Sequence, residues 1–309
     1  NMRYCEGDFT LGTGQYIIEA RGGDKVVPNI QNCEFTGFGC VINSVVNNTV
    51  DIDGAVILNN IFSEQHEEHL TGVGWKNSEV AYNEATHATQ GAGFRQFFFT
   101  ARDTDAASVL ATAPDTLDAH HNKFTKQTGS GAGNECLEAE SGKDVTFRYN
   151  WVTECTEDAF EHIYARDGCT IEYCVADNCV GQVADIYRMT NADGTQIKTP
   201  NDLSGADVTK TYVHHIYGDC TNMALVIDSI RGVVFHDIYV DNTGAGSTEA
   251  NIEIRDRDSI ESREVYGAGA LPLDSEVQAT AGRLIIDSTT NDCEVRYWDE
   301  SGVLQTETN

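Results

Sequence analysis

Short stretches of alternating apolar and polar residues recur along the chain, and a similar four-residue segment follows most of them. The stretches include 56–58, 145–147, 170–172 and 233–235, and the segments lie at 32–35, 59–62, 121–124, 149–152, 173–176, 214–217 and 236–239, with a weaker copy at 81–84. Alternation with a period of two predicts β-strands, and no window shows helical periodicity. The pattern therefore predicts an all-β protein.

One position inside the segment sets the period of the repeat. It is occupied by Cys33, Asn60, Asn83, Asn122, Asn150, Cys174, His215 and Asp237, which are separated by 27, 23, 39, 28, 24, 41 and 22 residues. A strand-rich repeat of about 20–30 residues predicts a solenoid in which each repeat forms one coil. We expect this position to face inward at a bend, where Asn side chains form a hydrogen-bonded ladder from coil to coil.

The two longest steps predict two long loops inserted into single coils, at residues 91–117 and 191–208. Long loops on a rigid scaffold commonly carry binding or contact residues. Because a solenoid extends one core, we expect a single parallel β-helix over residues 31–309. Residues 1–30, with a strand at 16–20, are expected to form a lead-in that caps the open end of the sheets.

This repeat resembles that of the right-handed parallel β-helix proteins of the pectate-lyase-like superfamily, over roughly residues 31–300. The superfamily includes pectate and alginate lyases, polygalacturonases and the tail spikes of bacterial viruses. The resemblance implies a right-handed, single-stranded parallel β-helix that binds carbohydrate along one parallel sheet. It is a resemblance of repeat pattern, which specifies fold better than activity.

Composition narrows the choice of ligand. The chain has 309 residues and a net charge of −29, from 49 acidic and 20 basic residues. This charge repels nucleic acid and other dense polyanions, so we expect no nucleic-acid partner. It favours a neutral or lightly charged glycan, or one bridged by calcium. No apolar run is long enough to span a membrane.

The cysteines predict a column in the core. Cys155, Cys179 and Cys220 each lie five residues after a position of the repeat. Strands of adjacent coils are about 4.8 Å apart, which a disulfide can bridge. Two interpretations remain open, a ladder of buried thiols and at least one disulfide between coils. The His120–His121 doublet belongs to the repeated segment and is interpreted as ladder or flanking residues.

The strongest candidate for chemistry combines Glu161 and Arg166 on one coil with Asp185 and Arg188 on the next. Cations that neutralise a uronate carboxylate acidify the neighbouring proton, which a base then removes. The stretch is similar to the active-site coils of the polysaccharide lyase family containing chondroitin and alginate lyases. That similarity implies that Glu161 is a calcium ligand, Arg166 occupies the base position and Arg188 is its partner.

Two departures weaken the lyase hypothesis. Arg166 stands where the family has Lys, and Arg stays protonated at ordinary pH. Ala159 stands where a second calcium-binding acid is expected. Arginine–carboxylate pairing on the surface is the alternative. Paired carboxylates for glycoside hydrolysis are the other candidate chemistry, and the acids near the relevant strands are Glu138, Glu140, Glu161, Asp185, Asp228, Asp256 and Asp258.

Two functions from different classes follow. The first is an extracellular β-helix protein that binds a polysaccharide and cleaves it, as a lyase or a glycoside hydrolase. The second is a non-enzymatic virion spike, adhesin or envelope protein. Both place the chain outside the cell or on a virion surface. The sequence predicts either no cofactor or calcium, and a homotrimer is the assembly expected for a spike.

Overall fold

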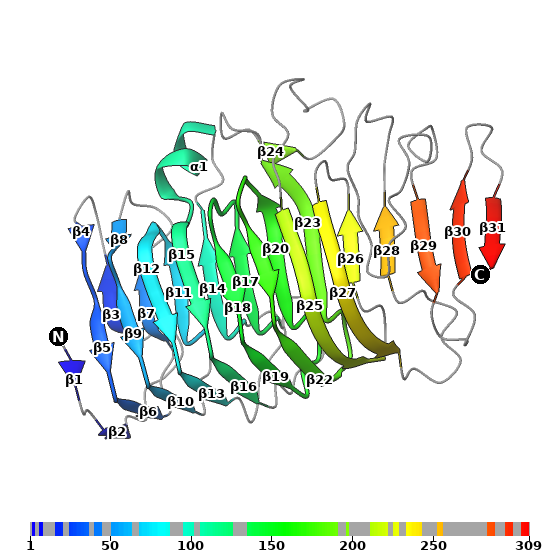
Figure 1. Ribbon diagram of the computed structural model, residues 1–309. Coiled ribbons are helices and arrows are strands. Elements are labelled where there is room, and N and C mark those ends of the chain that lie inside the picture. The colour runs from blue at the N-terminus through cyan, green and yellow to red at the C-terminus, as the bar shows by residue number, and fades with distance from the viewer. Residues whose placement is uncertain are drawn as a thin grey trace.

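The structure is a computed structural model that describes the chain in segments. These are residues 2–3, 6–8, 16–20, 25–36, 40–44, 51–63, 68–86, 95–101, 106–125, 135–190, 196–197, 211–221, 225–228, 233–242, 252–255, 283–287, 294–298 and 304–308. Figure 1 shows an elongated stack of strands with the N-terminus at one end and the C-terminus at the other. Nearly all described secondary structure is β-strand, as the sequence predicts.

Two sheets run the length of the stack within the described residues. The 18-stranded sheet A contains β1 (Met2–Arg3), β2 (Glu6–Asp8), β4 (Lys25–Val26), β5 (Asn29–Gln31), β6 (Glu34–Thr36), β8 (Asp51–Asp53), β9 (Val56–Leu58), β10 (Ile61–Ser63), β12 (Trp75–Ala81), β13 (Glu84–Thr86), β15 (Asp115–His120), β16 (Lys123–Thr125), β18 (Thr146–Arg148), β19 (Trp151–Thr153), β21 (Thr170–Glu172), β22 (Val175–Cys179), β25 (Thr211–Cys220) and β27 (Val233–Asn242). The 13-stranded sheet B contains β3 (Tyr16–Ala20), β7 (Cys40–Ser44), β11 (Leu70–Val73), β14 (Phe97–Thr100), β17 (Leu137–Glu140), β20 (Phe160–Ala165), β23 (Ala184–Thr190), β24 (Gln196–Ile197), β26 (Leu225–Asp228), β28 (Ile252–Arg255), β29 (Arg283–Asp287), β30 (Glu294–Trp298) and β31 (Leu304–Thr308). 

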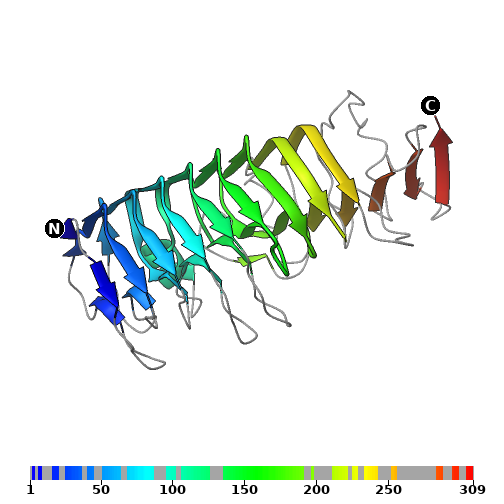
Figure 2. The ribbon, with the colours of Figure 1, turned by 90° about the horizontal axis from the view of Figure 1, so that it is seen from below.

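Strands of successive coils pair in parallel register. In sheet B, Leu70 lies opposite Phe97, Phe97 opposite Leu137 and Leu137 opposite Phe160. Seen from below in Figure 2, the strands follow one another along a single axis. Stacked parallel sheets of this kind are consistent with a β-solenoid. Among the described residues, no helix is long and apolar enough to span a bilayer.

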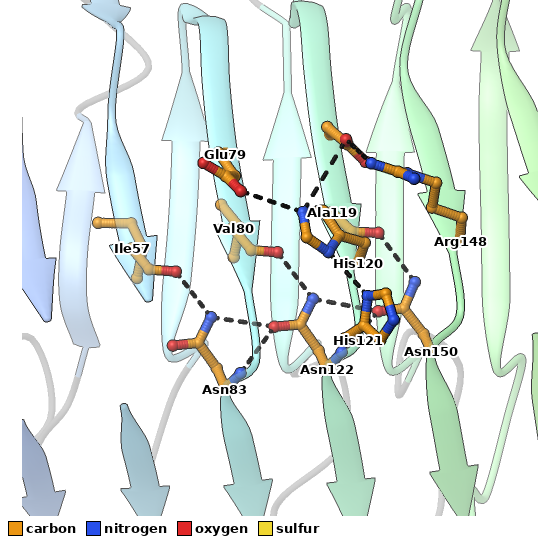
Figure 3. Close-up of polar contacts among 11 residues, drawn as sticks. Ile57, Glu79, Val80, Asn83, Ala119, His120, His121, Asn122, Arg148 and Asn150 are labelled. Atoms are coloured by element: carbon orange, nitrogen blue, oxygen red, sulfur yellow. Dashed lines mark hydrogen bonds and ion pairs between the residues drawn. The ribbon is translucent and has the colours of Figure 1, made fainter. Parts of the chain in front are cut away.

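An asparagine ladder joins the coils at the bend between the two arms of sheet A (Figure 3). The Nδ2 group of Asn122 donates to the carbonyl oxygen of Val80 at 2.9 Å and to Oδ1 of Asn150 at 3.1 Å. Asn83 donates to Asn122 in the same way, through Nδ2 at 2.9 Å. Each side chain therefore satisfies backbone groups that the bend removes from the strand ladder. The ladder confirms the inward column predicted from the repeat.

The residue before each ladder position has left-handed backbone geometry. The φ angle is 57° at Tyr82, 54° at His121, 55° at Tyr149 and 52° at Tyr173. A non-glycine residue in this region costs on the order of 1–2 kcal/mol. Stacking of the side chains offsets this cost, since the rings of Tyr149 and Tyr173 lie parallel with centroids 5.0 Å apart. The bend thus places an aromatic column outside and an amide column inside.

The register differs from the prediction in the last two coils. His214 pairs with His236 and Ile216 with Ile238, and the backbone N–H of Tyr217 donates to the carbonyl oxygen of Cys174. The inward column therefore continues from Cys174 to the buried Ile216 rather than to His215, and Asp237 is likewise one position too early. The alignment was wrong because the amide ladder ends at Cys174, after which strands β25 and β27 run through the bend.

The strands at the two ends of the chain pair in different ways. Strands β1, β2 and β3 already pair in parallel with β5, β6 and β7, as the later coils do. At the other end, β28 pairs antiparallel with β29, β29 with β30 and β30 with β31. The parallel coils predicted to continue to about residue 300 therefore give way to an antiparallel meander after β28. The alternating pattern of these strands is the same for both kinds of pairing.

The two predicted insertions are described only in part. The first contains the short helix α1 (Ala106–Thr112), which sequence periodicity did not reveal. In the second, β24 pairs antiparallel with the end of β23, and the rest of 191–208 lies outside the described residues.

The core between the sheets is apolar and contains the cysteine column. Cys179 lies opposite Cys220, and the backbone N–H of Val180 donates to the carbonyl oxygen of Cys155, so the three cysteines share one column as predicted. All three are buried, and the structure joins none of them in a disulfide. Cys136 joins them from sheet B, with its Sγ 3.2 Å from that of Cys155. The structure therefore corresponds to the thiol-ladder interpretation.

Candidate functional site

A row of acidic residues crosses neighbouring strands of sheet B on the face opposite the core. Glu138 pairs with Glu161, and Glu161 pairs with Asp185. Leu137 and Ala139, on either side of Glu138, belong to the core. Because side chains alternate along a strand, Glu138 and its partners project to the outer face.

A second acidic row lies three residues earlier in each coil. Backbone hydrogen bonds align the segments beginning at Glu135 and Asp158, since the N–H of Cys136 donates to the carbonyl oxygen of Asp158 at 3.0 Å. In both segments two core residues separate the acids, Cys136 and Leu137 in the first, and Ala159 and Phe160 in the second. The chain bends at these pairs, so both acids of each segment reach the outer face. We call Glu135, Glu138, Asp158, Glu161 and Asp185 the acidic cluster.

The acidic cluster is buried although it lies on the outer face. Relative exposure is 1% for Glu138, 5% for Glu161 and 8% for Asp185. One guanidinium offsets the negative charge. Arg95 pairs through Nε with Glu138 and, at 3.2 Å, with Glu135. Its guanidinium also lies 4.4 Å from the centre of the Phe98 ring, a cation–π arrangement that holds it in place.

Burial and mutual repulsion favour the protonated form of the acids. Burial raises the pKa of Glu138 well above its usual range, although Arg95 opposes the shift. Burial also raises the pKa of Glu161 far above normal, and the charges of Glu138 and Asp185 add to the effect. The pKa of Asp158 rises in the same way, through burial and then Asp185. Perturbed carboxyl groups gathered in one place are typical of binding and catalytic sites.

Arg95 itself stays charged. Burial acts to lower the pKa of Arg95, but the charges of Glu138 and Glu135 outweigh it and raise the pKa. Arg95 thus places a positive charge beside Glu138 and Glu135.

The positions of three carboxyl groups fit a divalent cation. One oxygen from each of Glu135, Asp158 and Glu161 lies within 4.8 Å of the other two. Calcium binds carboxylate oxygens at about 2.3–2.6 Å, so oxygens on opposite sides of the ion are about 4.6–5.2 Å apart. Oε2 of Glu161 is buried and has no hydrogen-bond partner in the described part of the chain. A bound cation would satisfy a buried, unpartnered oxygen of a carboxyl group that belongs to such a cluster.

The structure brings two of the four predicted site residues together. Glu161 and Asp185 are paired on adjacent strands. Arg166 lies elsewhere, because its Nε donates to the carbonyl oxygen of Ser141 at 2.8 Å. Burial lowers the pKa of Arg166, and the carboxylates that act on it are those of Asp115 and Asp144 rather than Glu161.

Arg188 does not align with Arg166. The backbone of Arg188 belongs to β23, where Ile163 pairs with Tyr187 and Ala165 with Met189, so residue 188 lies opposite residue 164. Its side chain lies outside the described residues. Of the other predicted acids, Glu140 and the backbone of Asp228 share one register position of sheet B, two residues after Glu138. Asp256 and Asp258 lie outside the described residues.

Sequence reasoning missed Arg95, Glu135 and Asp158. Their signal is a polar–apolar–apolar–polar pattern that recurs in successive coils, as Glu135 to Glu138 and Asp158 to Glu161. This spacing fits neither an alternating strand nor a helix. It therefore does not predict that both acids face outward unless the bend between the core residues is known. Asp158 lies three residues before Glu161, whereas the resemblance implies a second acid two residues before it, where Ala159 stands.

Comparisons with known proteins add no family to this picture. No protein-family model matches the chain, and neither the curated proteins nor the solved structures give a significant match.

Proposed function

We propose that this protein binds a polysaccharide on the outer face of sheet B, with Glu135, Asp158 and Glu161 holding a divalent cation, calcium by preference. The observation that carries the proposal is the Glu161 carboxyl group, whose buried Oε2 lacks a hydrogen-bond partner among the described residues and which lies close to the carboxyl groups of Glu135 and Asp158. A bound calcium ion would supply positive charge that attracts sugar carboxylates. Without it, a chain of net charge −29 repels an acidic glycan.

The fold supports a polysaccharide rather than a small ligand. Parallel coils present a long, regular face on which successive sugar units can meet successive strands. The superfamily that the repeat resembles binds carbohydrate on such a face. We further propose that the coil is right-handed, since parallel crossover connections are right-handed in nearly all proteins. An extracellular or virion-surface location and a homotrimer complete this proposal.

Hydrolysis of the bound glycan is the second candidate function, favoured by the raised pKa values of Glu138 and Glu161. A carboxyl group that stays protonated near neutral pH can donate a proton to the leaving oxygen of a glycosidic bond. Elimination is less well supported, because Arg166 lies apart from Glu161 and an arginine is a poor base.

The test is retention of polysaccharides on the purified protein. Acidic and neutral polysaccharides are applied with calcium or with EDTA, and the wild-type protein is compared with Glu161→Gln. We expect calcium-dependent retention of an acidic polysaccharide that both EDTA and the substitution abolish. Glu34→Gln, which changes an exposed acid on sheet A, is the matched control and should bind normally.

Each outcome decides between the functions. Retention that is the same with calcium and with EDTA would overturn the proposal that a cation bridges the protein and the polysaccharide. No retention at all would favour a spike or envelope component that does not bind polysaccharide. Release of new reducing ends would show hydrolysis, and an ultraviolet-absorbing unsaturated product would show elimination.

A further inference from the structure

A pair of adjacent histidines forms an unusual contact at the bend of sheet A. Strand β15 ends at His120, and His121 follows with a φ of 54°. In a regular strand, neighbouring side chains point to opposite faces. The left-handed residue removes this alternation, so both imidazoles lie on the outer face. Figure 3 shows the two rings directed at each other, with their Nδ1 atoms 2.9 Å apart and their planes 82° apart.

Surrounding groups fix both rings. Nε2 of His120 lies 3.2 Å from Oε1 of Glu79, and 4.0 Å from Oδ2 of Asp118, which Arg148 also binds. A carboxylate at Nε2 favours the tautomer with its proton there and leaves a lone pair on Nδ1. Histidines that bind metals characteristically donate their other N–H group to a carboxylate in this way.

The ring of His121 lies between two tyrosines. Its centroid is 4.9 Å from that of Tyr82 and 4.9 Å from that of Tyr149, with interplanar angles of 23° and 28°. Stacking covers the ring faces but leaves the ring plane open, and a metal ion binds imidazole nitrogen in that plane. Burial, His120 and Arg148 lower the pKa of His121, against Asp118, so the ring is neutral and available as a ligand at neutral pH.

The two Nδ1 atoms are joined by a hydrogen bond, and a metal ion would take the place of the shared proton. The separation of the two nitrogens then favours one kind of coordination over another. For metal–nitrogen bonds of about 2.0–2.1 Å, two nitrogens 2.9 Å apart subtend an angle of about 90° at the ion. That angle belongs to square-planar or octahedral coordination, whereas tetrahedral zinc would hold the nitrogens about 3.3 Å apart. Copper(II) combines imidazole ligands, tetragonal geometry and the highest affinity among the divalent ions of its series.

We propose that His120 and His121 bind a divalent transition metal ion through their two Nδ1 atoms, with copper(II) preferred and water completing the coordination. The arrangement recurs three coils further along the chain. Nδ1 of His214 lies 2.9 Å from Nδ1 of His215, the rings are 81° apart, and Nε2 of His214 lies 3.2 Å from Oε2 of Glu172. The recurrence indicates that the bend itself produces the geometry. This site is separate from the acidic cluster, which lies on sheet B.

The test is titration of the metal-free protein with copper(II), followed by calorimetry and electron paramagnetic resonance. His121→Asn removes the imidazole but keeps a residue that tolerates left-handed geometry. We expect this variant to bind one equivalent fewer than wild type, with loss of nitrogen hyperfine structure from that site. Glu79→Gln should weaken copper binding about 10–100-fold at the same site, because it removes the carboxylate behind His120.

Glu34→Gln, which changes an exposed acid on sheet A outside both proposed sites, is the control and should retain the nitrogen-ligated copper. The proposal would be overturned if His121→Asn bound as much copper as wild type, or if the spectrum showed oxygen ligands alone. The contact between the two Nδ1 atoms would then be a hydrogen bond and no more. Zinc binding as tight as copper would contradict the coordination argued from the 2.9 Å separation.

Discussion

Replacing Glu161 by Gln should change stability in opposite directions with and without calcium. In the metal-free protein, burial and neighbouring charges raise the pKa values of Glu161, Asp158 and Glu138. The folded state therefore binds more protons than the unfolded chain at intermediate pH. The contribution of these acids to folding stability is fully present below their unfolded pKa of about 4. It is lost as pH rises through their raised pKa values in the folded state. Removing one acid should relieve part of this loss.

The distances set the size of the effect. Oxygens within 4.8 Å of one another repel by about 3 kcal/mol per ionised pair at an effective dielectric constant of about 20. Protonation of some members reduces this repulsion, so we expect Glu161→Gln to stabilise the metal-free protein by about 1–3 kcal/mol near pH 8. For a domain of 150 residues or more this raises Tm by about 2–4 °C for each kcal/mol.

With calcium bound, the wild-type protein should be more stable than Glu161→Gln. A ligand at a hundred times its Kd stabilises the native state by about 2.7 kcal/mol, and Glu161→Gln loses one of three carboxylates that hold the ion. The measurement is thermal unfolding of both proteins near pH 5 and pH 8, with calcium or EDTA. Calcium should have little effect near pH 5, where protons compete for the carboxylates. A wild-type protein that is equally stable in calcium and EDTA at pH 8 would refute the reasoning.

Three further predictions concern the scaffold and are read by denaturant unfolding. Asn122→Ala removes the partners of the Val80 carbonyl and the Asn83 N–H and should cost about 2–4 kcal/mol; an effect below about 1 kcal/mol would contradict the ladder. Gly218→Ala places a Cβ 1.6 Å from the Ala176 carbonyl oxygen and should cost more than about 3 kcal/mol, so normal stability would contradict the close approach. Arg95→Met leaves Glu138 buried without its cation and should cost about 3–5 kcal/mol, with the loss larger near pH 8 than near pH 5; a pH-independent loss would argue against the ion pair.

The repeat made the fold predictable, whereas the site depends on local bends and on the register of individual coils, which the repeat does not show. Stacking of Asn83, Asn122 and Asn150 follows from period alone, since one residue type recurs at one position. The pairing of Glu161 with Asp185 follows in the same way once the coil length is known. Glu135 was not predictable, because its outward direction depends on a bend between two core residues. The register of His215 failed because Ile216 replaces the Asn or Cys that marks the bend in earlier coils.

The physical difference between the columns explains why the acidic cluster needs a partner. A solenoid places equivalent residues about 4.8 Å apart in adjacent coils. Side chains of the same kind therefore lie next to one another along each column. Amides such as Asn122 both donate and accept, and rings such as Tyr149 stack, so these columns stabilise themselves. Carboxylates repel, and the ion pairs of Arg95 among the described residues are with Glu138 and Glu135, which lie on one coil. Protons or a cation between Glu135, Asp158 and Glu161 would relieve this repulsion, and a cation can also attract an acidic glycan.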